Sequence, residues 1–84
     1  MIELLAVFRS RSQAMDCNSR LRRYGIPSNL INTPKEAGVG CGLSVKFPKE
    51  AEMHARAVIS RGKYSAFYGF MTVNTNYGRT VFKW

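Results

Sequence analysis

A nearly continuous apolar run near the start of the chain constrains its fold more than any other feature. Residues 2–8 contain a single charged side chain, Glu3, among seven positions. A run of this kind is typical of a central strand that other parts of the protein cover, because a strand exposed on one side alternates apolar and polar residues. Basic residues follow the run instead of preceding it, and no small-residue cleavage site comes after it. We therefore interpret it as a buried strand and not as a signal peptide.

Two later segments carry the apolar spacing of amphipathic helices. The first begins at a capping-box pattern, Ser10 with Gln13 three residues later, and ends at Gly25. The second is predicted to begin at Pro48, which suits the first position of a helix, and to end at Gly62. Each helix is expected to bury one apolar face against a sheet.

Four further strands complete the predicted pattern. They are expected over residues 26–31, 43–47, 66–73 and 79–84. The strand over 43–47 alternates, which predicts that Leu43, Val45 and Phe47 point inward and that Ser44 and Lys46 point outward. The order is β-α-β-β-α-β with an extra C-terminal strand, and right-handed crossovers then predict an α+β fold: a ferredoxin-like split βαβ sandwich with two helices on one face of an antiparallel sheet. Residues 1–84 are predicted to form a single domain, in which residues 64–84 are an aromatic C-terminal β-hairpin extension of the same sheet.

Charge and composition narrow the classes of function. Thirteen Lys and Arg residues against five acidic ones give a net charge of +8, which favours anionic partners. Two cysteines and one histidine are too few for a disulfide scaffold or a zinc site, so we expect no metal and no cofactor. No apolar run reaches the ~20 residues that span a bilayer. We expect a cytoplasmic protein with free thiols and no membrane partner.

The predicted topology brings one of the two thiols, that of Cys41, to an edge of the sheet near the start of the first helix. The same edge is expected to hold residues 9–12, the loop from Asn32 to Cys41 and the Lys63-Tyr64 connection into the next strand. The residues expected to surround the Cys41 thiol are Arg9, Ser10, Arg11, Ser12, Thr33, Lys35, Gly40, Gly42 and Lys63. Cations and helix amides of this kind lower the pKa of a thiol, and glycines allow backbone amides to approach an anion.

A structural interpretation of Cys41 stands beside the reactive one. A lone cysteine at the start of a strand is often a small buried hydrophobe, and its glycine neighbours can simply form a turn. Spacing alone favours this structural interpretation. Cys17 lies on the apolar stripe of the first helix and is expected in the core, whereas His54 lies off the stripe of the second helix and is expected in solvent.

Several pieces of the sequence, taken in order, resemble one known family. They are Leu4 to Phe8, Ser10 to Ser12, Gly25-Ile26, Thr33 to Glu36 and Cys41 to Leu43. Their combination resembles the family described as putative Se/S carrier protein-like, over about residues 2–62. The resemblance implies that Cys41 carries sulfur or selenium as a persulfide or selenopersulfide. It also implies donor and acceptor proteins as partners, and a carrier protein more than a turnover enzyme.

Two alternatives stay open. The high charge and seven aromatic residues among the last twenty-one suggest a basic RNA-binding or protein-interaction module with an aromatic open sheet face and a structural Cys41. Residues 68–73 imitate an aromatic RNA-binding motif, but they fall on the fourth predicted strand and not on the third. Some of these aromatic residues could instead be buried in a homodimer.

Overall fold

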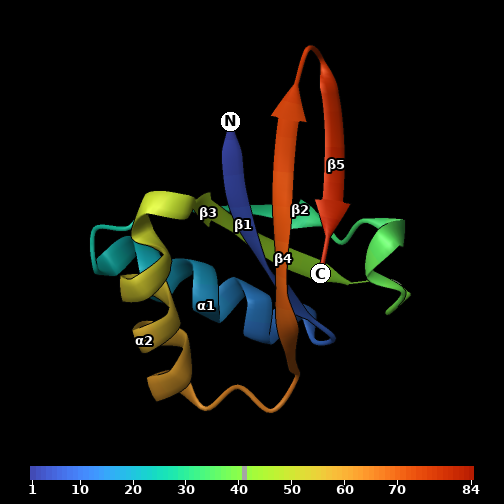
Figure 1. Cartoon of the computed structure of the whole chain (residues 1–84). Helices are drawn as coiled ribbons and strands as arrows, with labels where there is room; N and C mark the ends of the chain where they lie inside the picture. The colour runs from blue at the N-terminus through green and yellow to red at the C-terminus, as the bar shows by residue number, and fades with distance from the viewer. Residues whose placement is uncertain (41) are drawn as a thin grey trace.

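Five strands form one curled antiparallel sheet, and two helices pack on one of its faces (Figure 1). The computed structural model describes residues 1–40 and 42–84. The elements are, in chain order, β1 (Ile2–Phe8), α1 (Arg11–Arg23), β2 (Asn29–Asn32), η1 (Lys35–Ala37), β3 (Leu43–Pro48), η2 (Lys49–Ala51), α2 (Glu52–Gly62), β4 (Phe67–Asn76) and β5 (Arg79–Lys83). The strand order is β2-β3-β1-β4-β5.

The predicted α+β class is confirmed, with two helices and an added fifth strand in the same sheet. Strand β3 lies between β1 and β2 and is antiparallel to both, as in a split βαβ sandwich. Strand β4 pairs with the other side of β1, from Ile2 opposite Asn74 to Phe8 opposite Phe67. Because the strands curl into a half-barrel, the stricter ferredoxin-like assignment stays a prediction.

The apolar run of β1 is buried on both faces of the sheet, which explains why it does not alternate. Leu4, Ala6 and Phe8 face the helices, where they pack with apolar residues of α1 and α2. Leu5 and Val7 face the opposite side, which is covered by η1, by Val39 and by Phe82 of β5, so a second small core forms there. Burying each large side chain contributes roughly 1.5–3 kcal/mol, so this strand anchors the fold.

Helix α1 begins where the capping pattern predicts. The Ser10 hydroxyl accepts a hydrogen bond from the Gln13 backbone amide at 3.2 Å. The Gln13 side chain, however, crosses to the segment before β4: its Oε1 accepts from the Ala66 amide at 2.8 Å and its Nε2 donates to Ser65 Oγ at 2.9 Å. The Arg9 amide also donates to the Ala66 carbonyl at 2.9 Å. The start of α1 is therefore fastened to the start of β4.

The predicted second strand begins too early. Strand β2 starts at Asn29, because the preceding residues are held by α1 and not by the sheet. Arg22 Nη1 donates to the Ser28 carbonyl at 2.8 Å, and the Ser28 hydroxyl donates to Asn18 Oδ1 at 2.7 Å. Ile26 is buried in the core on the helix side.

The boundaries of α2 also differ from the prediction. Pro48 is the last residue of β3, and the short 3-10 turn η2 precedes the helix, which begins at Glu52. Gly62 is the last helical residue, and Lys63 after it takes the left-handed conformation, with φ 49°. No helix in residues 1–40 and 42–84 combines the length and the apolar character that crossing a membrane needs.

Candidate functional site

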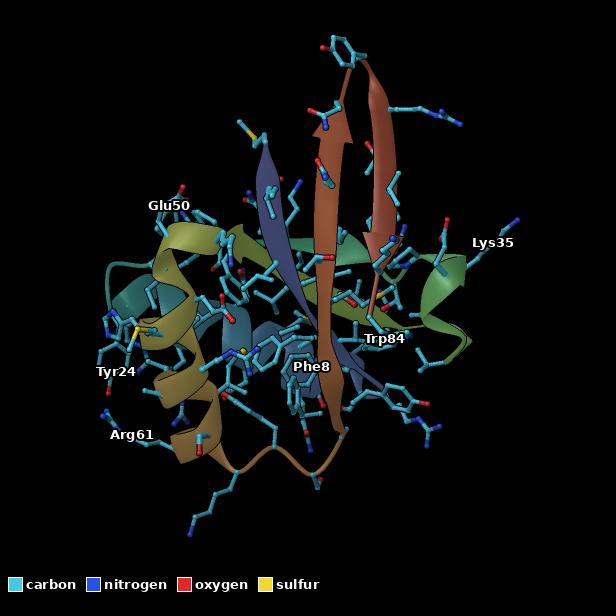
Figure 2. All side chains as sticks on the ribbon, in the orientation of Figure 1. Phe8, Tyr24, Lys35, Glu50, Arg61 and Trp84 are labelled. Carbon is cyan, nitrogen blue, oxygen red and sulfur yellow. The ribbon has the colours of Figure 1, made fainter. Side chains whose placement is uncertain are left out.

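A cleft of about 380 Å³ opens beside the start of α1 and the η1 turn. Its lining residues are Arg11, Asn32, Thr33, Lys35, Gly40 and Gly42. They come from the first turn of α1, the end of β2, η1 and the loop on both sides of position 41. Two of them are cations and none is acidic, so the cleft has a positive potential. Figure 2 shows Lys35 extending outward from η1.

The η1 turn gives this cleft one of its walls. Ala37 is buried against Leu5 and Val7 on the sheet face opposite the helices. Ser44 is paired with Val7 in the sheet register and is fully buried on this face, although the alternating pattern of its strand predicted that it points outward to solvent. The Ser44 and Thr33 hydroxyls lie 2.7 Å apart and share a hydrogen bond, which satisfies both groups beneath the turn. The sequence prediction for Ser44 is wrong because a distant segment folds over its face.

The floor of the cleft depends on a close approach of two backbones. The Gly42 carbonyl accepts a hydrogen bond from the Thr33 amide at 3.1 Å. A Cβ atom on Gly42 would lie 2.9 Å from the Phe8 carbonyl oxygen, closer than side chains normally come to backbone. Gly40 has φ 77°, which favours glycine for a different reason. Glycine at both positions is thus required by the geometry of the cleft.

We expect Gly42→Ala to lower the free energy of unfolding by roughly 1–3 kcal/mol, because β1 and β3 must separate to admit the methyl group. Urea denaturation followed by circular dichroism measures this loss. Asn32→Ala is the matched control: this exposed residue lines the same cleft, and its substitution should change stability by less than about 0.5 kcal/mol. Equal stability of the two variants would contradict the proposed close contact.

The structure brings five of the predicted site residues together in this cleft and places others beside it. The five are Arg11, Thr33, Lys35, Gly40 and Gly42. Asn32 also lines it; the sequence placed this residue at the same edge, but did not assign it to the site. Cys41, the predicted centre of the site, lies outside the described residues.

The remaining predicted site residues have other contacts. Ser10 caps α1, and its hydroxyl lies 3.0 Å from that of Ser12. The Arg9 guanidinium lies over the Tyr68 ring, 4.8 Å from its centroid. Lys63 lines a different cleft, between α2 and β4. Arg9 and Lys63 are therefore not among the residues that line the cleft of Gly40 and Gly42.

Cys17 has the environment of an inert core thiol, as its place on the apolar stripe predicted. Its side chain is fully buried between α1 and the sheet. Burial, with a smaller contribution from the neighbouring Asp16 charge, raises the pKa of the Cys17 thiol from 9.0 to about 12. The thiol therefore stays protonated at neutral pH and is a poor nucleophile.

This pKa shift predicts that Cys17 destabilises the fold in alkaline solution. The folded-state pKa is raised, so the stabilisation is complete below pH 9.0 and is lost as the pH rises towards about 12. Unfolding free energy measured across this window should fall less steeply for Cys17→Ala than for the unchanged chain. Tyr64, whose pKa burial also raises, adds a slope that is common to both. If the unfolding free energies of the two proteins fell equally with pH, the pKa of the Cys17 thiol would not be raised in the folded protein.

The aromatic residues of the C-terminal part divide between the two sides of the molecule. Tyr64, Phe67 and Phe70 are half-buried against the helix-side core. Tyr68 and Trp84 are exposed and lie against each other, with ring centroids 5.4 Å apart. The central strands thus have buried side chains on both faces, unlike a sheet with one open aromatic face.

The other titratable candidates do not assemble a second reactive centre. His54 is exposed, as predicted, and its ring centroid lies 6.0 Å from that of Tyr24. Among residues 1–40 and 42–84, no group of three or more His, Cys, Asp and Glu side chains could hold a metal ion.

A family model described as Putative Se/S carrier protein-like matches residues 3–68. No curated protein and no solved structure matches the chain. The matched segment runs from β1 to the start of β4 and includes all the lining residues of the cleft that holds Gly40 and Gly42.

Proposed function

Since this chain belongs to the family described as Putative Se/S carrier protein-like, we propose that Cys41 carries a sulfur or selenium atom for a partner protein. The atom is held as a persulfide or selenopersulfide. Donor and acceptor proteins dock over the cleft beside α1, and the chain acts as a carrier more than as a turnover enzyme.

The observation that supports this proposal is the position of the two chain neighbours of Cys41. Gly40 and Gly42 both line the cleft that also contains Arg11 and Lys35. Arg11 is the first residue of α1, so the positive end of the helix dipole lies at the same place. Such positive groups lower the pKa of a thiol and stabilise the anion of a persulfide.

The transfer is a pair of exchange reactions at sulfur. The Cys41 thiolate attacks the terminal sulfur of a donor persulfide; a new S–S bond forms as the donor S–S bond breaks, and the donor leaves as a thiolate. The proton of the donor persulfide stays on the transferred sulfur. An acceptor thiolate then repeats the step and releases Cys41 as a thiolate. A selenopersulfide donor reacts in the same way, with selenium as the transferred atom, and no external oxidant is needed.

Intact-mass spectrometry after incubation with glutathione persulfide tests the proposal. The unchanged protein should gain one sulfur atom per chain, and Cys41→Ser should gain none. Cys17→Ala is the matched control and should gain sulfur normally, because that thiol is buried. Equal labelling of the unchanged protein and Cys41→Ser would reject Cys41 as the carrier.

The charges of the cleft allow a second, graded measurement. Replacing Arg11 and Lys35 by Gln should slow sulfur uptake by roughly threefold to tenfold, because the thiol pKa rises when nearby cations are lost. Replacing Arg23 and Arg61, exposed residues in the last turns of α1 and α2 that do not line this cleft, should have little effect. If both pairs of substitutions slowed sulfur uptake equally, the rate would depend on the total charge of the protein, which would contradict a role for this cleft.

A further inference from the structure

A second cleft, of about 440 Å³, lies between α2 and β4 and shares no lining residue with the first. Figure 1 shows the two elements joined by the long connection that precedes β4. One wall carries the aromatic rings of Tyr64, Phe67 and Phe70. The facing wall is formed by α2, with a cation towards each end. This cleft combines an apolar surface with positive charge, and the proposed carrier function gives it no role.

The helix wall follows from the spacing of its residues. Arg56, Ile59 and Lys63 all line the cleft. Arg56 and Ile59, three positions apart, lie on one face of the helix, and Lys63 follows its C-terminal end. At 1.5 Å of rise per residue, Arg56 lies about 9 Å along the axis from Gly62, the last helical residue, so the apolar Ile59 separates Arg56 from Lys63.

The aromatic wall is held in place by its own contacts. The Phe67 and Phe70 centroids lie 4.9 Å apart, and the Arg56 guanidinium lies 4.3 Å from the Phe70 centroid. The Tyr64 hydroxyl donates to Asp16 Oδ2 at 2.6 Å, which fixes its ring across to α1. A Cβ atom on Gly62 would lie 2.9 Å from the Cζ atom of that ring, so glycine makes room for it. The wall is thus formed before any ligand arrives.

Lys63 is an unusual residue for its backbone position. It follows the end of α2 with φ 49° and ψ 49°, the left-handed conformation that glycine normally supplies there. Strained non-glycine residues of this kind concentrate at functional sites. Among the ion pairs of the described residues, none includes Lys63, whereas Arg56 already pairs with Glu52 at 2.9 Å. Lys63 is exposed and available to an anion.

We propose that this cleft binds a small amphiphilic organic anion, an aryl or short alkyl carboxylate. The apolar body packs against Phe67, Phe70 and Ile59, and the carboxylate pairs with Lys63. Arg56, which lies over the Phe70 ring, adds positive potential at the other end of the cleft. The volume falls within the range of small-molecule sites in proteins.

An NMR titration with 3-phenylpropionate tests this proposal, with neutral 3-phenylpropan-1-ol as the matched probe. The carboxylate should cause saturable amide shifts at Ile59, Lys63 and Phe67, and it should bind more tightly than the alcohol. Lys63→Gln should weaken carboxylate binding by roughly threefold to tenfold, the contribution of a partly exposed ion pair, and should leave alcohol binding unchanged. Lys35→Gln, in the other cleft, should leave both unchanged.

Lys63→Gly separates loss of binding from loss of folding. This variant removes the charge and the backbone strain together, so its melting temperature should rise while its affinity for the carboxylate falls. Equal affinities for the two probes, or unchanged carboxylate binding by Lys63→Gln, would overturn the proposal. Shifts confined to Gly40, Gly42 and their neighbours would overturn it too, by assigning the anion to the first cleft. Sulfur uptake by Cys41 should be the same in all Lys63 variants.

Discussion

Iodoacetamide added to the native protein at pH 7 should modify Cys41 and leave Cys17 intact, with rates that differ by ~10³ or more. The thiolate is the reacting species, and a pKa raised from 9.0 to about 12 lowers its population at Cys17 by ~10³ at neutral pH. Full burial of Cys17 slows the reagent further. Positive charge in the cleft of Arg11 and Lys35 should speed the reaction of Cys41.

Peptide mapping by mass spectrometry at several reaction times measures both rates in one sample. In concentrated urea the two thiols should react at similar rates, which controls for intrinsic differences between them. Replacing Arg11 and Lys35 by Gln should slow Cys41 alone. Comparable rates for the two cysteines in the native protein would show that Cys41 is as protected as Cys17, and would favour its structural interpretation.

Phe8→Ala should remove about 3–5 kcal/mol from the free energy of unfolding. The Phe8 side chain is fully buried in the layer between sheet and helices (Figure 2). Its ring centroid lies 5.5 Å from that of Tyr64 and 5.5 Å from that of Phe67, so the substitution leaves a cavity where three rings meet. Small domains have about 5–15 kcal/mol of stability in total, so this loss would leave a marginal fold.

Urea denaturation at neutral pH measures the effect, and Tyr68→Ala is a suitable control. Tyr68 is also aromatic, but it is exposed, so its loss should cost about 1 kcal/mol or less. Phe8→Leu should recover most of the stability, because it refills much of the cavity. A Phe8→Ala variant as stable as Tyr68→Ala would mean that the ring cluster contributes little.

Features with a local cause could be predicted from the sequence. The cap of α1 depends on the Ser10 hydroxyl, and the structure contains its predicted hydrogen bond from the backbone amide three positions later. The burial of Cys17 follows from the helical spacing of apolar residues around it. The central place of β1 follows from its unbroken apolar run. Each of these features is predicted by a pattern that spans only a short stretch of the sequence.

Features that depend on distant segments were missed. The burial of Ser44 results from η1, which folds over a face that an isolated hairpin would expose. The late start of β2 results from hydrogen bonds between Ser28 and the side of α1. Lys63 lines the cleft beside α2 and takes a left-handed backbone after the helix, which residue spacing does not predict. The spacing of residues along the sequence does not predict contacts between distant segments.

The pairing of β4 with β1 gives the C-terminal segment an architectural role. The family match ends at Tyr68, while β4 continues to Asn76 along one flank of the central strand. A chain cut after Tyr68 would leave that flank without its hydrogen-bonding neighbour and would strip Met71 and Val73 from the second core. In this protein the residues beyond Tyr68 therefore complete both the sheet and the second core, and the matched region depends on them for its stability.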